Sequence, residues 1–387
     1  MNTSAHNFIA KPITQGPKHH FFGYYGICPW DATGRYVLCL ESDFHERLPG
    51  AGDRAVVGMV ELATGKFEPL AETRAWNFQK GCMLHWLPTA PDRLIIYNDR
   101  QNDRFVSVVL DIHSGERRVL PHPISALSHD GRQALSLNYA RLSDMRPVVG
   151  YAGLADPFAD QKHPTDDGVT LMDTETGEAK VLVSYEEVRA FLSVYPKIQT
   201  SKIWFNHPVI NHNDSRFTFL VRWHEPGISR KHPILLTAGL QGGNLRLVTD
   251  LGASHHVWQT PEHLFGWISM PEGYHYYLVN DANGDYQPVR PDILTKNGHC
   301  SFSQDGTWLL TDEYPDEDNY QALLLWHMAE ERLVVLERFL ASQPFRGEIR
   351  CDLHPRWSRD ERQVCFDSIH EGTRQVYVMD VSEVLKA

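Results

Sequence analysis

The sequence lacks the features that mark a membrane-bound or exported protein. No stretch approaches the roughly 18 uninterrupted apolar residues of a transmembrane helix, and the first residues, MNTSAHNFIAKPIT, contain no apolar segment typical of a signal peptide. The six cysteines form no CxxC pair and are few for 387 residues, which favours free thiols in a reducing compartment. We therefore expect a cytoplasmic protein with no membrane partner.

A surplus of positive charge is also missing. The chain has 37 Lys and Arg against 49 Asp and Glu, a net charge of -12, whereas affinity for nucleic acid is built from surplus Lys and Arg. We therefore expect no nucleic-acid partner. The chain does have 42% hydrophobic residues, enough for a folded core, together with 21 His, 10 Trp and 15 Tyr. Imidazoles carry protons near neutral pH, and aromatic faces stack on sugars.

Internal repeats give the strongest indication of the fold. A turn signal followed by an apolar or alternating run occurs seven times, as DATGRYVLCL, APDRLIIYND, SHDGRQALSL, NDSRFTFLVR, TPEHLFGWIS, SQDGTWLLTD and SRDERQVCFD. A second unit of strand, turn and strand follows each copy, except that the last copy is followed by only one strand before the chain ends. Two hairpin-like units per repeat make about four strands, and such units repeated around an axis form a β-propeller.

The sequence therefore predicts an all-β protein, a seven-bladed β-propeller that forms a single domain over residues 1–387. We expect the amino-terminal segment NFIAKPIT to supply the missing strand of the last blade and so to close the ring. The longest insertion lies between residues 138 and 208, where SYEEVRAFLSVY predicts a short helix capped by Ser184. An α/β fold is disfavoured because long amphipathic patterns are almost absent, and two sandwiches because no Pro/Gly/Ser-rich hinge divides the chain.

In a propeller, the residues just before each repeated turn come from different blades and converge on one mouth of the central channel. These segments are rich in His, Tyr and Arg. A single His near a strand end is more often structural than a ligand, but its recurrence in almost every blade favours a functional pocket. The candidate substrate-binding residues are His20, Tyr25, His85, Tyr139, Arg146, His207 and Arg350.

A divalent-metal site is indicated near the carboxyl end. His299 precedes Asp305 by six residues and His354 precedes Asp360 by six, so the two imidazoles should lie at equal depth in adjacent blades. Asp352 is two residues before His354 and would point to the same side of an extended strand. Two His and one carboxylate suit Zn, Mn or Fe.

Other interpretations of this region stay open. Asp352 could instead pair with Arg350 or Arg356, and Cys300 and Cys351 could supply thiolate ligands, which would favour zinc. The run DEYPDEDN, from Asp312, is interpreted as a charged, solvated loop, with cation binding as the alternative.

These residues and the blade rhythm resemble the seven-bladed propeller polysaccharide lyases, above all the oligogalacturonate lyases and more distantly the ulvan lyases. The resemblance implies that His255, in ASHHVW, is the catalytic base and that Arg230 is the catalytic arginine. It also implies a manganese site at His299 and His354. The chain departs from the family in having Asp352 where a second His is found.

A second departure is Ile349, which lies on or near the position of the family's glutamine ligand. The amino-terminal motifs HHFFGYYGICPWD and RLSDMRPVVGYAG look more like the ulvan-lyase side, with His85, Tyr139 and Tyr151 as candidates for the His and Tyr of those enzymes.

The resemblance implies a lyase that cleaves 4-linked uronic-acid-containing glycans by β-elimination, with an acidic oligosaccharide as substrate and Mn or Zn as cofactor. The C5 proton can be removed only if the adjacent carboxylate is neutralised, here by the metal held by His299, Asp352 and His354 and by Arg230. One alternative is a non-catalytic propeller that binds a glycan or a protein. A hydrolase with paired carboxylates is less suitable, since Asp352 is the only acidic candidate.

Overall fold

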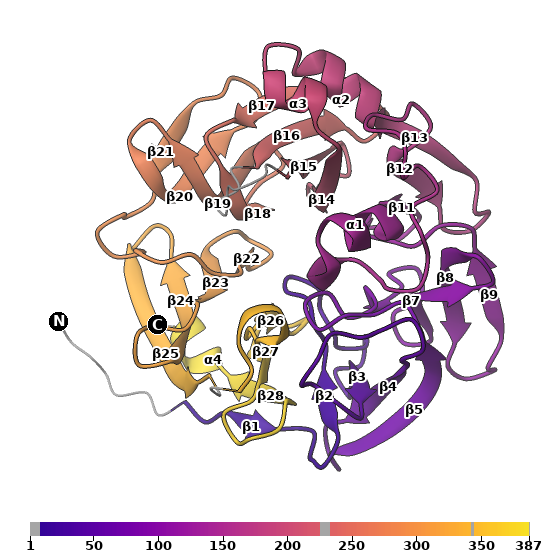
Figure 1. Ribbon diagram of the computed structural model, residues 1–387. Coiled ribbons are helices and arrows are strands. Elements are labelled where there is room, and N and C mark those ends of the chain that lie inside the picture. The colour runs from indigo at the N-terminus through magenta and orange to yellow at the C-terminus, as the bar shows by residue number, and fades with distance from the viewer. Residues whose placement is uncertain (1–7, 225–232, 342–343, 387) are drawn as a thin grey trace. The chain divides into compact units, whose positions relative to one another are not determined.

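The structure is a computed structural model that describes residues 8–224, 233–341 and 344–386. Within these residues the strands form seven four-stranded antiparallel sheets. In six of them the four strands follow one another directly in the sequence, as the colours of Figure 1 show. Seven such sheets are the blades of a seven-bladed β-propeller, which confirms the predicted all-β fold.

The chain divides into two compact units, and the first comprises residues 1–48, 55–72 and 298–387. One of its blades consists of β2 (His19–Phe21), β3 (Tyr36–Ser42), β4 (Ala55–Glu61) and β5 (Lys66–Thr73). The next consists of β22 (Ser301–Phe302), β23 (Trp308–Asp312), β24 (Tyr320–His327) and β25 (Arg332–Leu340). The third consists of β26 (Arg356–Trp357), β27 (Gln363–Ser368), β28 (Gln375–Asp380) and β1 (Lys11–Pro12). The short helices are η2 (Gly347–Ile349) and α4 (Ser382–Leu385).

The second unit comprises residues 49–54 and 73–297 and contains four blades. The first two consist of β6 (His85–Trp86), β7 (Leu94–Gln101), β8 (Arg104–Asp111) and β9 (Arg117–Leu120), and of β10 (Ala126–Leu127), β11 (Gln133–Ser136), β12 (Gly168–Asp173) and β13 (Ala179–Ser184). The other two consist of β14 (Ile203–Ile210), β15 (Arg216–Trp223), β16 (Ile234–Gly239) and β17 (Arg246–Thr249), and of β18 (Ala253–Trp258), β19 (His263–Met270), β20 (Gly273–Asn280) and β21 (Tyr286–Pro288). Its helices are α1 (Tyr139–Met145), η1 (Pro147–Val149), α2 (Tyr185–Phe191) and α3 (Pro196–Thr200). The prediction of one domain over the whole chain stays a prediction.

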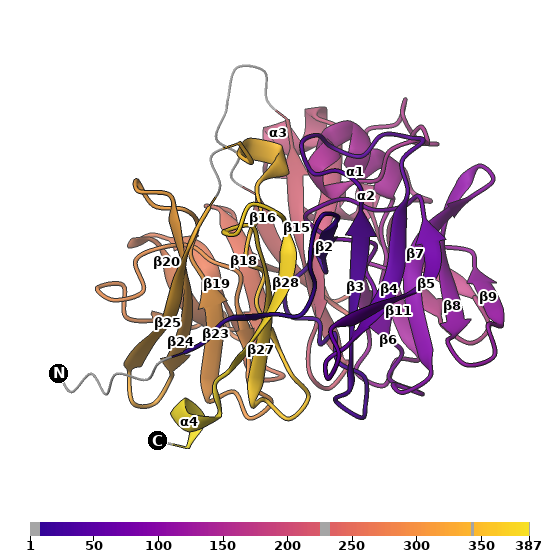
Figure 2. The same ribbon diagram turned by 90° about the horizontal axis from the view of Figure 1, so that it is seen from below.

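The amino-terminal strand completes the last blade, as predicted. β1 pairs antiparallel with β28, with Lys11 opposite Val378, so this sheet has the order β1-β28-β27-β26 (Figures 1 and 2). The Ile13 side chain, just after β1, packs with Val376 and Trp30 in a buried cluster. The two ends of the chain are therefore held in one sheet and one core of the first unit.

The repeated turn signal has a shared hydrogen-bond pattern, which explains why the repeat is visible in the sequence. The Ser303 hydroxyl donates to Asp305 Oδ1 (2.6 Å) and accepts the backbone N–H of Trp308 (2.9 Å). Asp305 Oδ1 also accepts the Thr307 N–H (2.9 Å). The same Ser–Asp pair recurs at Ser128 and Asp130 and at Ser358 and Asp360. The turn fixes the hairpin between the first two strands of the blade, and with it the loop that precedes that hairpin.

The predicted helix in the long insertion is confirmed. The Ser184 hydroxyl accepts the Glu187 N–H (3.1 Å), and the Glu187 carboxylate accepts the Ser184 N–H (2.6 Å), so a capping box begins α2. Among the described residues no helix is both long and apolar enough to cross a membrane.

Candidate functional site

Three buried side chains of the first unit gather into the His/Asp cluster, which consists of His299, Asp352 and His354. One ligand atom from each lies within 4.8 Å of the others. The two imidazole rings meet edge to face, with centroids 4.2 Å apart. His299 lies just before β22 and His354 just before β26, so the equal spacing from the following turns brought them together as predicted.

The prediction that Asp352 and His354 lie on one extended strand is wrong. Residues 351–355 are a loop and not an extended strand, and His354 has a left-handed backbone with φ of 46°. The side chains of Asp352 and His354 therefore converge through loop geometry and not through strand alternation. Cys300 and Cys351 are not part of the cluster, and burial raises the pKa of both thiols, to about 12 for Cys351.

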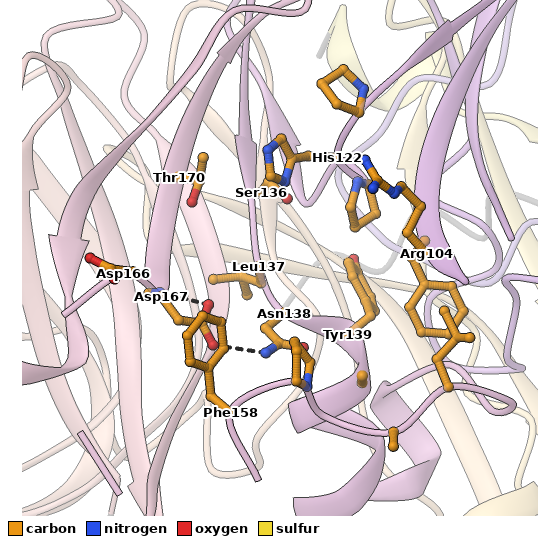
Figure 3. Close-up of a pocket in the computed structure, with 18 of the residues that line it drawn as sticks. Arg104, His122, Ser136, Leu137, Asn138, Tyr139, Phe158, Asp166, Asp167 and Thr170 are labelled. Carbon is orange, nitrogen blue, oxygen red and sulfur yellow. Dashed lines mark hydrogen bonds between the residues drawn. The ribbon is translucent and has the colours of Figure 1, made fainter. Parts of the chain in front are cut away.

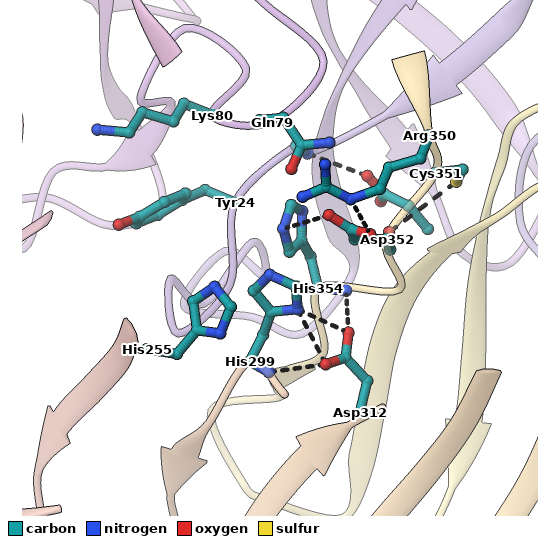
Figure 4. Close-up of polar contacts among 12 residues, drawn as sticks. Tyr24, Gln79, Lys80, His255, His299, Asp312, Arg350, Cys351, Asp352 and His354 are labelled. Atoms are coloured by element: carbon teal, nitrogen blue, oxygen red, sulfur yellow. Dashed lines mark hydrogen bonds and ion pairs between the residues drawn. The ribbon is translucent and has the colours of Figure 1, made fainter. Parts of the chain in front are cut away.

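Asp312, at the end of β23, contacts both histidines of the cluster, the ring and backbone of His299 and the backbone of His354 (Figure 4). Its Oδ1 accepts the backbone N–H of His299 (2.7 Å), and His299 Nδ1 donates to the two carboxylate oxygens (2.9 and 3.0 Å). Its Oδ2 accepts the His354 N–H (3.1 Å). A proton on Nδ1 of His299 places the ring's lone pair on Nε2, which is how an outer carboxylate prepares a metal-binding His.

The expectation that DEYPDEDN is a solvated loop is therefore wrong for its first residue. Asp312 is 1% exposed, because it ends the buried strand WLLTD and does not belong to the loop that follows. Sequence reasoning missed this residue. The available signal was the apolar run WLL directly before it, which extends a buried strand up to the carboxylate.

The two carboxylate oxygens of Asp352 have different surroundings. Its Oδ1 accepts a hydrogen bond from Arg350 Nε (2.8 Å), so the predicted pairing with Arg350 exists. Its Oδ2 is buried and has no hydrogen-bond partner among the described residues, with His354 Nε2 at 3.9 Å. A buried carboxylate oxygen left over beside two imidazoles is what a divalent cation would satisfy, so these residues fit a metal.

Two further predicted residues of the first unit border the cluster. The Tyr25 ring lies 5.1 Å from that of His299 and 5.9 Å from that of His354, and burial raises the pKa of its phenol well above 10.0. The guanidinium of Arg350 lies 5.3 Å from the ring centroid of Tyr314. Burial lowers the pKa of Arg350, but the charges and hydrogen bonds of Asp352 and Tyr314 together outweigh this effect and raise the pKa above its ordinary value.

His20 lies in a different network of the same unit. Its Nδ1 is 3.1 Å from Gln375 Oε1, its Nε2 is 3.3 Å from a Glu41 oxygen, and its ring packs on Phe67. Burial lowers its pKa. These contacts tie β2 to β28 and β3, and they favour a structural role for His20.

The second unit contains the predicted base. His255 is buried on β18, and its Nδ1 lies 3.1 Å from Asn297 Oδ1, an acceptor, so Nδ1 is the protonated nitrogen. Its ring lies 6.0 Å from that of His207. His256 contacts the carbonyl oxygens of Ser254 and His207 through its two ring nitrogens, which fits the structural role expected of it. Arg230 lies outside the described residues.

This unit also contains a basic cluster, in which the charges of Arg146 and Arg222 act on Lys80 and the charges of Lys80 and Arg222 act on His207. Burial, together with the charges of Arg146 and Arg222, lowers the pKa of Lys80 to about 7. Burial and the charge of Lys80 lower the pKa of His207 well below 6.5. Sequence reasoning missed Lys80 and Arg222. The signal for Lys80 was a lysine within the apolar segment WNFQKGCMLHW.

The remaining predicted residues of this unit are His85, Tyr139, Tyr151 and Arg146. On β6, burial lowers the pKa of His85 to about 3, and its Nε2 is buried with no hydrogen-bond partner among the described residues. Tyr139 and Tyr151 stack with centroids 4.1 Å apart, and burial raises the pKa of Tyr139 to about 12. Arg146 ends α1, where its backbone N–H donates to Leu142 O (2.7 Å).

Tyr139 also lines a cavity of about 310 Å³ beside α1 (Figure 3). Asn138 donates to Asp167 in the wall (2.7 Å), and burial raises the pKa of that carboxyl. The wall carries Asp103, Asp166 and Asp167 against one cation, Arg104. An acidic wall does not favour an acidic oligosaccharide, so this cavity supports no role for Tyr139 in binding one.

Comparison with solved structures places the fold among known propellers. The oligogalacturonate lyase from Vibrio parahaemolyticus superimposes with a TM-score of 0.68 at 16% identity, over 98% of this chain and 96% of that chain. An oligogalacturonate lyase in complex with manganese gives 0.67 at 14% identity, over 98% and 97%. The tricorn protease gives 0.53 at 9% identity, over 99% of this chain and 35% of that chain.

The predicted resemblance to oligogalacturonate lyases is therefore confirmed for the fold. The same fold also occurs in a protease, so the fold does not assign the chemistry. No family model matches the chain, and no curated protein matches it.

Proposed function

We propose that this chain is a lyase that cleaves 4-linked uronic-acid-containing oligosaccharides by β-elimination. The observation that carries the proposal is the buried His/Asp cluster, which presents three convergent metal-ligand atoms on a fold like that of a manganese-binding oligogalacturonate lyase. A divalent cation at this cluster would be Mn or Zn, since both accept imidazole nitrogen and carboxylate oxygen.

The chemistry requires that the uronate carboxylate be neutralised before the C5 proton can leave. His299, Asp352 and His354 would hold the cation, with Asp312 fixing the orientation of His299. Such a cation would supply Lewis acidity, which would withdraw charge from the carboxylate. Tyr25 keeps its proton because burial raises its pKa, so its phenol remains a hydrogen-bond donor beside these ligands.

His255 is the proposed base. With Nδ1 donating to Asn297, the lone pair is on Nε2, the form that accepts a proton. The proton that it takes is the one on C5. The electron pair then forms the C4–C5 double bond as the C4–O4 bond breaks, and the departing O4 takes a proton from a tyrosine, water or another His. Arg230 keeps its proposed role as a further carboxylate partner.

The test is an assay for the unsaturated uronate product by its ultraviolet absorbance, on a panel of uronides. We expect product with oligogalacturonate, loss of activity with EDTA, and recovery on addition of Mn or Zn. A folded protein that forms no unsaturated product from any uronide contradicts the proposal. Unaltered oligosaccharide bound after long incubation would identify a propeller that only binds a glycan.

A further inference from the structure

The cavity beside α1 lies wholly within the second unit, since the residues that line it fall between 103 and 170 (Figure 3). Its volume of about 310 Å³ is at the lower end of the range of small-molecule sites, which is roughly 300–1,000 Å³. The proposed lyase reaction assigns no role to this cavity. The polar groups in its wall therefore indicate what else the chain binds.

Two hydroxyl groups line the cavity from neighbouring strands. Ser136, on β11, lies directly opposite Thr170, on β12, in the antiparallel pairing (Figure 3). Residues opposite each other have Cβ atoms about 4.5–5.5 Å apart, so the two hydroxyls meet the same part of a ligand. Ser136 is 2% exposed, and neither hydroxyl has a hydrogen-bond partner among the residues that the structure describes. Buried hydroxyls are ordinarily hydrogen-bonded, so this pair points to a ligand with polar groups.

The carboxylate of Asp167 lines the same cavity and is 8% exposed. Its Oδ2 accepts a hydrogen bond from Asn138 Nδ2 (2.7 Å), and its Oδ1 accepts the backbone N–H of Gly168 (2.8 Å). Both donors are neutral, and each carboxylate oxygen can accept a second hydrogen bond. Burial raises the pKa of Asp167, although its hydrogen bonds and the charge of Arg141 act in the opposite direction. A bound cation would offset this cost of burial.

A neighbouring buried carboxylate shows what Asp167 lacks. Asp156 also accepts a hydrogen bond from the Asn138 amide (2.9 Å), and it lies 2.9 Å from Lys202 Nζ and 3.3 Å from Arg141 Nη1. Within the described part of the chain, no basic side chain forms an ion pair with Asp167. Asp156 is thus neutralised by the protein itself, whereas Asp167 has a cavity in front of it.

The hydroxyl pair and the carboxylate lie on successive steps of the same two chain segments. Ser136 is opposite Thr170, and two residues further along Asn138 donates to Asp167. Two residues of a strand span about 6–7 Å. A ligand that meets both places therefore carries two polar groups at about this separation, and the group at Asp167 is a cation.

The rest of the wall suits the body of such a ligand. The side chains of Phe105, Tyr139 and Phe158 line the cavity. Aromatic rings pack on the C–H groups of a sugar ring and attract cations to their faces. The excess of aspartates over basic residues in the wall disfavours an anion.

We propose that this cavity binds a small hydroxylated amine, the class that amino sugars represent, with its ammonium group at Asp167 and a hydroxyl group at Ser136 and Thr170. The ammonium donates to the carboxylate, and the two side-chain hydroxyls exchange hydrogen bonds with the ligand hydroxyl. Ser136, Asp167 and Thr170 take no part in the proposed lyase reaction, so the failure of either proposal leaves the other in place.

The test measures binding by calorimetry and thermal unfolding with three sugars of one ring type at millimolar concentration. D-galactosamine is the cationic probe, D-galactose is neutral and D-galacturonate is anionic. The variants are Asp167→Asn, which removes the charge at nearly constant shape, and Ser136→Ala, which removes one hydroxyl. The matched control is Asp160→Asn, because Asp160 is an exposed aspartate of the same insertion and does not line the cavity.

We expect galactosamine to bind and stabilise wild type and Asp160→Asn equally. Galactose should bind at least about 10-fold more weakly, since it has no charge-assisted hydrogen bond to Asp167. Asp167→Asn should lower galactosamine affinity about 10-fold or more for the same reason. Ser136→Ala should lower it about 2–10-fold, which corresponds to one neutral hydrogen bond.

Three results would overturn the site. They are no galactosamine binding by wild type, equal binding of galactosamine and galactose by wild type, and unchanged galactosamine affinity in Asp167→Asn. If Asp167→Asn does not fold, the comparison of the three sugars in wild type and the effect of Ser136→Ala decide, and unchanged affinity in Ser136→Ala then counts against the site.

Discussion

Both units are built from the same four-stranded blade, but the buried charged groups of their candidate sites have different neighbours. In the first unit, His299 contacts the Asp312 carboxylate and Arg350 contacts the Asp352 carboxylate, so acidic groups hold the positions of the basic ones. In the second unit, the charges that lower the pKa of Lys80 are those of other cations. The first arrangement suits a bound cation.

This contrast does not extend to every buried ion of the second unit. Arg141 is 0% exposed and contacts Asp156 (3.3 Å), and Arg216 lies 2.5 Å from Asp281. Structural cations are thus given carboxylate partners in both units.

The largest effect is expected for His255→Ala. Loss of a general base lowers kcat by about 10²–10⁴-fold, so oligogalacturonate cleavage should fall by that factor. Metal content should stay near the wild-type value, because His255 does not belong to the His/Asp cluster. His113→Ala, at an exposed turn of the same unit, is the control and should be fully active. Retained activity in His255→Ala would remove His255 from the reaction.

Asp312→Asn should show the next largest effect, which is a loss of metal affinity and not the loss of the general base. An amide can donate to Nδ1 of His299, which moves the ring proton to Nε2 and removes the lone pair that would bind the cation. We expect Mn or Zn affinity, measured by metal titration, to fall about 10–100-fold. Asp318→Asn, an exposed acid a few residues on, is the matched control. Unchanged affinity would mean that His299 is not a ligand.

The fold was predictable because each blade carries its own local signal. The Ser–Asp turn is completed within about five residues, as at Ser303 and Asp305, so the signal is repeated wherever a blade begins. The closing strand was predictable from a count, since the last repeat lacked one strand and the segment before the first repeat could supply it.

The site was predictable only in part. His299 and His354 each lie six residues before the aspartate of the following turn, and such a spacing can be counted within a short stretch of sequence. The carboxylate that holds them, Asp312, is joined to His354 across 42 positions of the chain, and no spacing rule reports such a contact. Lys80 was missed for a different reason, because an isolated lysine in a sequence is ordinarily exposed and its burial is a tertiary property.

A third prediction concerns stability and pH, and it isolates the burial of Lys80. Because its pKa falls from 10.5 to about 7 on folding, the unfolded chain binds more protons between those values, and this lysine makes stability rise with pH across that window. Lys80→Met lacks this pH-dependent contribution to stability. Without ligand, the variant should be more stable than wild type at pH 7 and below, and the difference should shrink toward pH 10.5 in urea unfolding series. A constant difference across this range would contradict the assigned burial.

The smallest effect is expected for the serine of the Ser–Asp turn, which occurs in both units. Ser303 in the first unit and Ser128 in the second each donate to the turn aspartate and accept the N–H five residues on (2.9 Å in both). Replacing either with Ala removes two hydrogen bonds whose net contribution is about 1 kcal/mol each, so both variants should lose roughly 1–3 kcal/mol of the free energy of unfolding. Metal affinity should not change in either. If Ser303→Ala alone weakened metal binding, the turn would help to position His299. The turn would then contribute to the metal site as well as to the fold.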